Sequence, residues 1–179
     1  MAHSARSFAV TIGDARQSVA ALCALLDDLA AVVAPLDVAA YTARPVSRAS
    51  GSIGEHVRHC LDHVASLLAA QPAAPLSYDH RERGTAVESD PAEALRRMMR
   101  LKAAFDRWPA GSLEDSILVQ VKTSTSFDAT TMFSTIGREV AFVVSHTIHH
   151  QALIGVLLEL VGQPAPGRFG YAPSTPSRV

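Results

Sequence analysis

Six of the eight histidines in this sequence gather in two short windows. Three lie within residues 56–63 and three within residues 146–150. Neutral imidazole is the commonest protein ligand for transition metals, and zinc and nickel both accept it. The six residues are His56, His59, His63, His146, His149 and His150. The clustering therefore points first to a metal site.

Both windows lie in segments with helical periodicity, so the direction of each ring can be estimated at about 100° per residue. The three histidines of residues 56–63 share one flank of the apolar face of their helix. His146 and His150 are one turn apart on a single face, whereas His149 is rotated to the side. Two histidines from one helix and one from a facing helix form a three-nitrogen site with an open position, as in catalytic zinc centres.

A second interpretation needs no metal. Single amphipathic histidines are common at the edge of a helical bundle, so no one of these residues is diagnostic by itself. Burying two groups of imidazoles costs desolvation energy, which ligation to an ion offsets. Glu139, seven residues before His146, is expected on the same face, where it could orient a ligand or accept a proton from bound water; it also fits a surface carboxylate.

Composition and motifs exclude several other functions. The 16 Lys and Arg residues are balanced by 17 Asp and Glu residues, so nucleic acid is not an expected partner. The most apolar stretch, 140–161, is interrupted by polar residues, which argues against a membrane span. Cys23 and Cys60 lie in apolar helical patterns and predict reduced core thiols in a cytoplasmic protein. The His-Glu-x-x-His protease motif, a glycine-rich phosphate loop and a Gly-x-Ser-x-Gly elbow are missing from the sequence.

The elements that must position the histidines are four helices. Apolar residues recur at steps of three and four along each, and Ser52 and Asp90 are placed as N-caps of the second and third. The expected ranges are 17–35, 50–70, 91–108 and 135–161. Alternating residues between 117 and 133 predict a short hairpin or extended segment before the last helix. The fold class is thus all-α, a four-helix bundle with a small extended insertion.

The connections are predicted to be irregular. Residues 71–89 read as a long loop carrying the charged run 78–83, and residues 163–179 as a proline-rich tail laid over the bundle by Phe169 and Tyr171. Residues 1–179 are expected to form one domain. The apolar stripes of the first and third helices also suggest that the bundle pairs into a homodimer.

Two motifs resemble a known family. Ser52-Ile53-Gly54-Glu55-x-x-x-His59 and Ser145-His146-x-x-x-His150 are similar to the motifs of the DinB-like (damage-inducible B) metalloprotein superfamily, and the similarity covers most of the chain. The resemblance implies a four-helix bundle with one zinc or nickel ion held by His59, His146 and His150. His56 and His63 flank the matching position, so either may replace or supplement His59 as the ligand.

The same resemblance bears on function. The superfamily includes bacillithiol and mycothiol S-transferases, thiol-dependent isomerases and part of ergothioneine synthases, whereas many members have no assigned activity. It implies a divalent-metal-binding protein, with a metal-dependent thiol S-transferase acting on a small electrophile as the leading function. The alternative is a non-catalytic metal-binding or stress-associated protein. The resemblance assigns no catalytic residue to this sequence. The 71–89 loop and the 163–176 tail are expected to roof the open side of the site, with Arg81 or Arg83 holding a substrate carboxylate.

Metal retention is predicted to depend on pH. An imidazole must be neutral to bind an ion, and its unperturbed pKa is about 6.5. Loss of the ion is therefore expected as the pH falls through about 6, and it can be measured by elemental analysis after dialysis at each pH. Full retention down to about pH 4 would instead indicate carboxylate or thiolate ligands.

Overall fold

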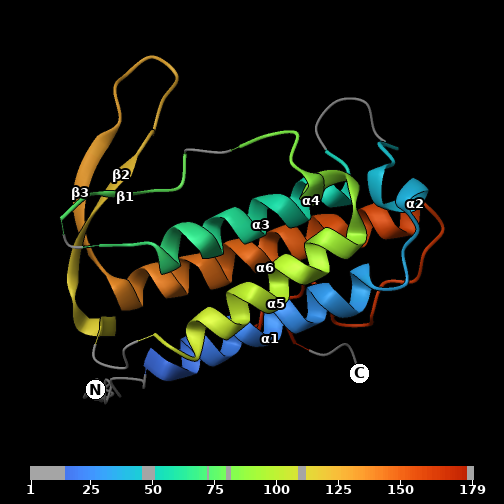
Figure 1. The fold of residues 1–179 in the computed structure, drawn as a ribbon, viewed down its shortest axis with the longest axis horizontal. Coiled ribbons are helices and arrows are strands. Elements are labelled where there is room, and N and C mark those ends of the chain that lie inside the picture. The colour runs from blue at the N-terminus through green and yellow to red at the C-terminus, as the bar shows by residue number, and fades with distance from the viewer. Residues whose placement is uncertain (1–14, 46–50, 72, 80–81, 109–111, 177–179) are drawn as a thin grey trace, which may run out of the picture.

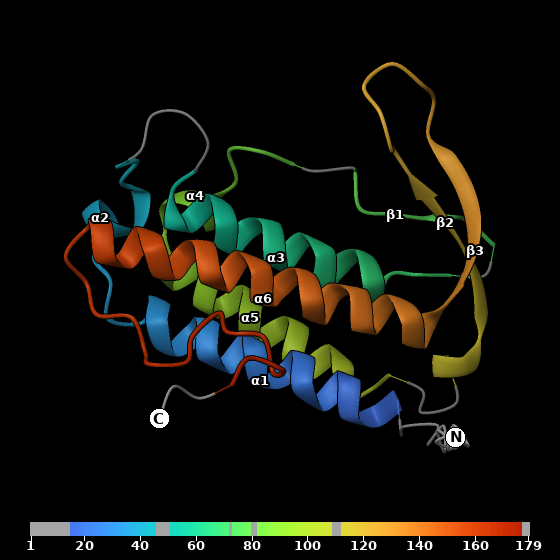
Figure 2. The ribbon, with the colours of Figure 1, turned by 180° about the vertical axis from the view of Figure 1, so that it is seen from behind.

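The computed structural model is mostly helical, with a small sheet at one end of the helices (Figure 1). It describes residues 15–45, 51–71, 73–79, 82–108 and 112–176. Four long helices run side by side: α1 (Ala15–Val33), α3 (Ile53–Leu68), α5 (Pro91–Phe105) and α6 (Ile136–Leu160). α6 packs against α1 and α3, and α5 packs against the same two helices from the other side (Figure 2).

The core lies between these helices and follows the predicted apolar stripes. The stripe of α3 is buried along its whole length, because its apolar residues recur once per turn. α1 contributes a run of fully buried leucines, and α6 contributes residues from both of its halves. Representative core residues are Leu22, Leu26, Leu29, Val57, Cys60, Val64, Met98, Val140, Val143, Ile154 and Leu157.

The predicted helix ends are present. Ser52 and Glu55 form a capping box, with the Glu55 amide donating to Ser52 Oγ over 3.2 Å and the Ser52 amide donating to Glu55 Oε2 over 2.7 Å. Thr135 caps α6, and Gly162 follows the helix at φ +74°, a conformation that glycine adopts without strain. These caps set where α3 and α6 begin, and hence where their histidines lie along the pair.

The expected hairpin is also present and is part of a larger sheet. β2 (Ser116–Val121) pairs antiparallel with β3 (Thr130–Thr135), and β1 (Leu76–Ser77) pairs parallel with β2. A single 3₁₀ turn (Ser112–Glu114) precedes β2. β3 continues directly into α6, so the hairpin stands at the N-terminal end of α6 (Figure 2).

Two connections are more regular than predicted. The 71–89 segment contains β1 and the short helix α4 (Ala86–Ser89), and a further short helix, α2 (Val38–Thr42), follows α1. The Tyr41 hydroxyl donates to the Val87 carbonyl over 2.8 Å, which joins α2 to α4. Elements of two to five residues have too few positions for a periodic pattern, so sequence periodicity does not reveal them.

A buried arginine fastens α3 to its neighbours. Arg58 is 6% exposed, and its guanidinium pairs with Glu88 of α4 at 2.8 Å and with Asp62 at 3.0 Å. Asp62 also pairs with Arg97 of α5 at 2.8 Å. Since every member of this network has an opposite charge beside it, the network compensates the desolvation of Arg58. The network fixes α3 at Arg58, the residue directly before His59.

By length and composition, α6 would also fit a membrane span. In this structure it packs against α1 and α3, as the core helix of a bundle does, and it carries several polar side chains among its buried residues. Thr147 and Gln151 are buried within it, and the Gln151 amide donates to the Leu25 carbonyl of α1 over 3.0 Å. This side-chain hydrogen bond ties α6 to α1.

The close packing of α4 on α3 generates a prediction for Gly54. A Cβ atom at this position would lie 2.1 Å from the Glu88 carbonyl oxygen and 2.7 Å from the Tyr41 ring. Gly54→Ala should therefore destabilise the fold by about 1–3 kcal/mol, as overpacking does, in urea denaturation.

Gly155→Ala is the matched control, because a Cβ there meets nothing closer than 3.8 Å. Replacing a glycine inside a helix by alanine should then stabilise the fold by about 0.5–1 kcal/mol. Equal effects at Gly54 and Gly155 would show that α4 does not contact α3 in this way.

Candidate metal centre

The antiparallel packing of α3 and α6 brings the two histidine windows face to face. All three histidines of α3 are buried, with exposed fractions of 9% or less. His146 and His150 are half-buried on the facing side of α6, and His149 is exposed. His149 is therefore rotated away from the site, as predicted.

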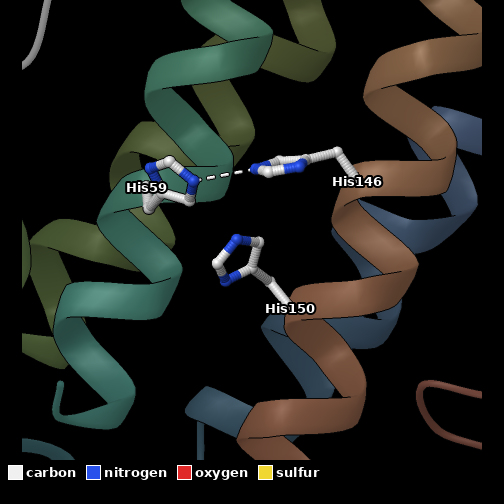
Figure 3. A group of neighbouring side chains, drawn as sticks. All are labelled: His59, His146 and His150. Atoms are coloured by element: carbon white, nitrogen blue, oxygen red, sulfur yellow. Dashed lines mark hydrogen bonds between the residues drawn. The ribbon is translucent and has the colours of Figure 1, made fainter. Parts of the chain in front are cut away.

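Three of the rings converge (Figure 3). His59, His146 and His150 each offer a ring nitrogen, and these nitrogens lie within 4.8 Å of one another. Nε2 of His59 and Nε2 of His146 face each other at 2.8 Å, and one nitrogen of His150 points toward that pair. The group predicted from sequence and resemblance is therefore assembled in space, by one residue from α3 and two from α6.

The spacing of these nitrogens fits a small ion after a minor adjustment. Two imidazole nitrogens bound tetrahedrally at 2.0–2.1 Å would lie about 3.3 Å apart. The 2.8 Å between His59 and His146 is about half an ångström shorter. Rotation of the two side chains can open that gap without moving the helices. The donor set of three imidazoles suits zinc or nickel better than magnesium or calcium, which prefer oxygen.

His56 contacts the group from outside it. Its Nδ1 lies 2.9 Å from Nδ1 of His150, so one of these two nitrogens carries the shared proton. If His150 donates that proton, its tautomer is fixed and its Nε2 keeps a free lone pair for an ion. A hydrogen-bond partner of this kind orients a metal ligand, which is a more direct role for His56 than ligation itself.

His63 takes a packing role on the other side. Its Nδ1 lies 3.0 Å from the His59 carbonyl, and its ring stacks on both His146 and Tyr78, with interplanar angles of 20° and 5°. Because the rings of His63 and His146 are stacked and nearly parallel, their lone pairs lie in nearly parallel planes and do not point at one ion. His63 therefore supports the ring of His146 and is the weakest ligand candidate of α3.

Burial keeps two of the imidazoles, His56 and His150, neutral near neutral pH. The pKa of His150 is lowered to about 3, chiefly by its removal from water and then by the neighbouring His146, His56, His149 and His63. The pKa of His56 is also lowered, again mainly by burial. Near neutral pH both rings are thus uncharged, the state in which imidazole donates a lone pair. Because these pKa values lie below that of free imidazole, the ion should be lost at a lower pH than the value of about 6 expected from the sequence, and retention down to about pH 4 is compatible with histidine ligands.

Glu139 lies on the His146 side of α6, as predicted, and is buried there. Its Oε1 accepts a hydrogen bond from Ser134 Oγ at 2.6 Å, so the carboxylate anchors β3 to α6. Burial and the nearby Glu139 carboxylate raise the pKa of Tyr78, which keeps its phenol protonated. Tyr78 is a residue that sequence reasoning did not single out, because its only signal was membership of a charged loop.

Two cavities flank the histidines along the α3–α6 pair. One, of about 380 Å³, is lined by His56, His59, His150 and Arg83, among others. The other, of about 480 Å³, lies between the hairpin and α6 and reaches His63 and His146. The 71–89 segment contributes to both, in agreement with the expected roof.

The expected role of the tail is wrong. The described residues of the 163–176 segment pack on the opposite face of α6, where Gly170, at φ +75°, approaches the backbone of Ala152 too closely for a side chain. Phe169 is buried there, as predicted, but Tyr171 is 57% exposed. Neither cavity beside the histidines has a lining residue from the tail. Arg83 lines a cavity, whereas Arg81 lies outside the described residues.

Comparison with known proteins identifies the family of this chain. The family model of the DinB superfamily matches residues 21–154, which include both histidine windows. The chain is also similar to FK506-binding protein 5 of Rhizopus delemar, with 31% identity over 101 residues. That match covers 56% of this chain and 26% of the relative, so the chain spans about a quarter of the relative's length. No solved structure matches the chain. With the family model covering three quarters of the sequence and the histidines of its motifs assembled on two facing helices, the chain belongs to the DinB superfamily.

Proposed function

We propose that this protein binds one divalent ion, zinc or nickel, through His59, His146 and His150. The observation that carries the proposal is the convergence of three ring nitrogens within 4.8 Å at the centre of the α3–α6 pair. The four long helices are, in this proposal, the DinB-like four-helix bundle that presents them. Burial supports it further, because the lowered pKa of His150 reduces competition from protons for its lone pair.

We propose further that the bound ion serves a thiol S-transferase. When present, the ion lowers the pKa of a thiol that coordinates it, so that the sulfur is a nucleophile at neutral pH. His59 and His150 both line the 380 Å³ cavity, which gives a small thiol a route to them. Arg83 lines the same cavity, where its guanidinium can bind a carboxylate of the thiol.

The proposed setting is the cytoplasm, where low-molecular-weight thiols are kept reduced. The competing function is a metal-binding protein without catalysis, in which the ion only ties α3 to α6. His56 is the residue that would favour it, since its ring lies beside His150 and could supply a fourth nitrogen. A closed four-ligand site is typical of structural zinc, whereas catalytic zinc keeps an open position.

Single substitutions should rank the ligands. His59→Ala, His146→Ala and His150→Ala should each abolish stoichiometric zinc binding in isothermal titration calorimetry, because a three-nitrogen site loses a ligand in every case. His56→Ala should weaken zinc binding about 10–100-fold, the usual cost of losing a residue that orients a ligand.

His149→Ala is the matched control, since it removes an exposed imidazole next to His150. Its affinity for zinc should equal that of the unsubstituted protein. Stoichiometric binding by His146→Ala, or a greater loss from His56→Ala than from His59→Ala, would contradict the assignment of the ligands.

A spectroscopic experiment tests the open position. Cobalt-substituted protein should develop a sulfur-to-metal charge-transfer band when N-acetylcysteine is added, because a coordinated thiol binds as thiolate. Arg83→Ala should weaken the response to N-acetylcysteine but not to 2-mercaptoethanol, which has no carboxylate. An unchanged cobalt spectrum with both thiols would exclude the transferase and leave metal binding as the function.

A further inference from the structure

The cavity between the hairpin and α6 has no role in the metal site as proposed. Its volume of about 480 Å³ lies within the range of sites that bind drug-sized organic molecules. One wall comes from the hairpin and includes Val121 and Phe133, and the facing wall includes Phe142 of α6. His146 lines its inner end, so an occupant would lie against the histidine cluster.

The walls of this cavity are largely apolar and partly uncovered. Phe133 is 86% exposed and Met132 is 46% exposed, although both belong to the cavity wall. Large exposed apolar side chains grouped around a concave site are typical of surfaces that a ligand covers. An apolar occupant would remove these side chains from water, which is the main source of affinity for such ligands.

The hairpin wall is held in position from both strands. The Lys122 amide, just after β2, donates to Asp79 Oδ2 over 2.9 Å, and Ser134 of β3 donates to Glu139 of α6 over 2.6 Å. β1 adds a parallel pairing to β2. The cavity is therefore a preformed space between anchored elements, which lowers the entropic cost of binding.

Charge around the cavity disfavours an anion. The described residues that line it include two carboxylates, those of Glu139 and Asp79, and one guanidinium, that of Arg138. The carboxylates outnumber the cation, and Glu139 is buried beside the protonated Tyr78. A neutral ligand brings no charge into the cavity that would lack an opposite charge beside it.

From these observations we infer that the cavity binds a neutral, mostly apolar organic molecule, and that this molecule is the electrophile. The second part rests on the proposed transferase function. The thiol and the electrophile then approach the histidine cluster from its two ends along α3 and α6. The thiolate sulfur forms a bond to the electrophilic carbon, the bond from that carbon to its leaving group breaks with its electron pair, and the thiol proton passes to solvent.

Binding can be tested without turnover by titrating the zinc-loaded, ¹⁵N-labelled protein with acetophenone, a neutral aromatic probe. Amide shifts are expected at Val119, Val121 and Phe142. In His150→Ala protein, where no bound ion attracts a carboxylate, benzoate, the anionic counterpart, should shift the same amides less than acetophenone does. Phe133→Ala should weaken acetophenone binding about 2–10-fold, the range expected for one aromatic contact.

Phe127→Ala is the matched control. Phe127 belongs to the loop that connects β2 to β3, its side chain is 74% exposed, and it does not line the cavity. It should leave acetophenone binding unchanged. The inference is overturned if acetophenone causes no shifts, if benzoate binds His150→Ala protein more tightly, or if both substitutions have equal effects. It is also overturned if sedimentation shows that Phe133→Ala abolishes self-association, since a second copy of the chain would then cover this wall.

Failure here is distinguishable from failure of the proposed function. If thiols alter the cobalt spectrum and acetophenone does not bind, the transferase proposal stands and the electrophile pocket is wrong. If acetophenone shifts the same amides in His150→Ala protein, which keeps every lining residue of this cavity and no longer binds zinc, the pocket stands independently of the metal.

Discussion

The central constraint in this molecule is the burial of imidazoles between two antiparallel helices. A neutral imidazole removed from water must find a partner for each of its ring nitrogens, and several such rings are placed side by side here. The short contacts between His59 and His146, and between His56 and His150, are the result. An ion that accepts several lone pairs at once satisfies this arrangement better than shared protons do, because protons would leave some lone pairs facing each other.

The rest of the fold can be understood as the frame that holds this pair of helices. The capping box at Ser52 sets where α3 begins, and the Arg58 network fixes α3 against α4 and α5. An ion pair between Lys102 and Asp27 joins α5 to α1, and α1 in turn packs on α6. Consequently the histidines project from helices whose ends and sides are fixed, and rigid elements of this kind hold a site more precisely than loops do.

Much of this arrangement could be predicted from the sequence, for reasons visible in single residues. Leu22, Leu26 and Leu29 repeat with the helical period and are buried as expected, and the alternation around Val119 marked a strand. Helical spacing placed His56, His59 and His63 on one flank and His146 and His150 one turn apart, and the resemblance to the DinB-like motifs then selected His59. Periodicity and spacing report one element at a time, and these features belong to single elements.

The parts that could not be predicted depend on contacts between distant segments. Nothing local at Arg58 shows that it pairs with Glu88 thirty residues later, or that Gly54 is small because α4 lies on it. The position of the tail on the opposite face of α6 likewise depends on the close approach of Gly170 to the backbone of Ala152. The two cavities arise only when the hairpin and the 71–89 segment are placed around the histidines.

The coordination of the ion by three imidazoles is the central claim, and X-ray absorption at the zinc edge of the loaded protein tests it most directly. We predict a first shell that contains three imidazole nitrogens at about 2.0–2.1 Å, with the outer-ring scattering that identifies histidine. A first shell with sulfur at about 2.3 Å in the absence of added thiol, or one made only of oxygens, would contradict it.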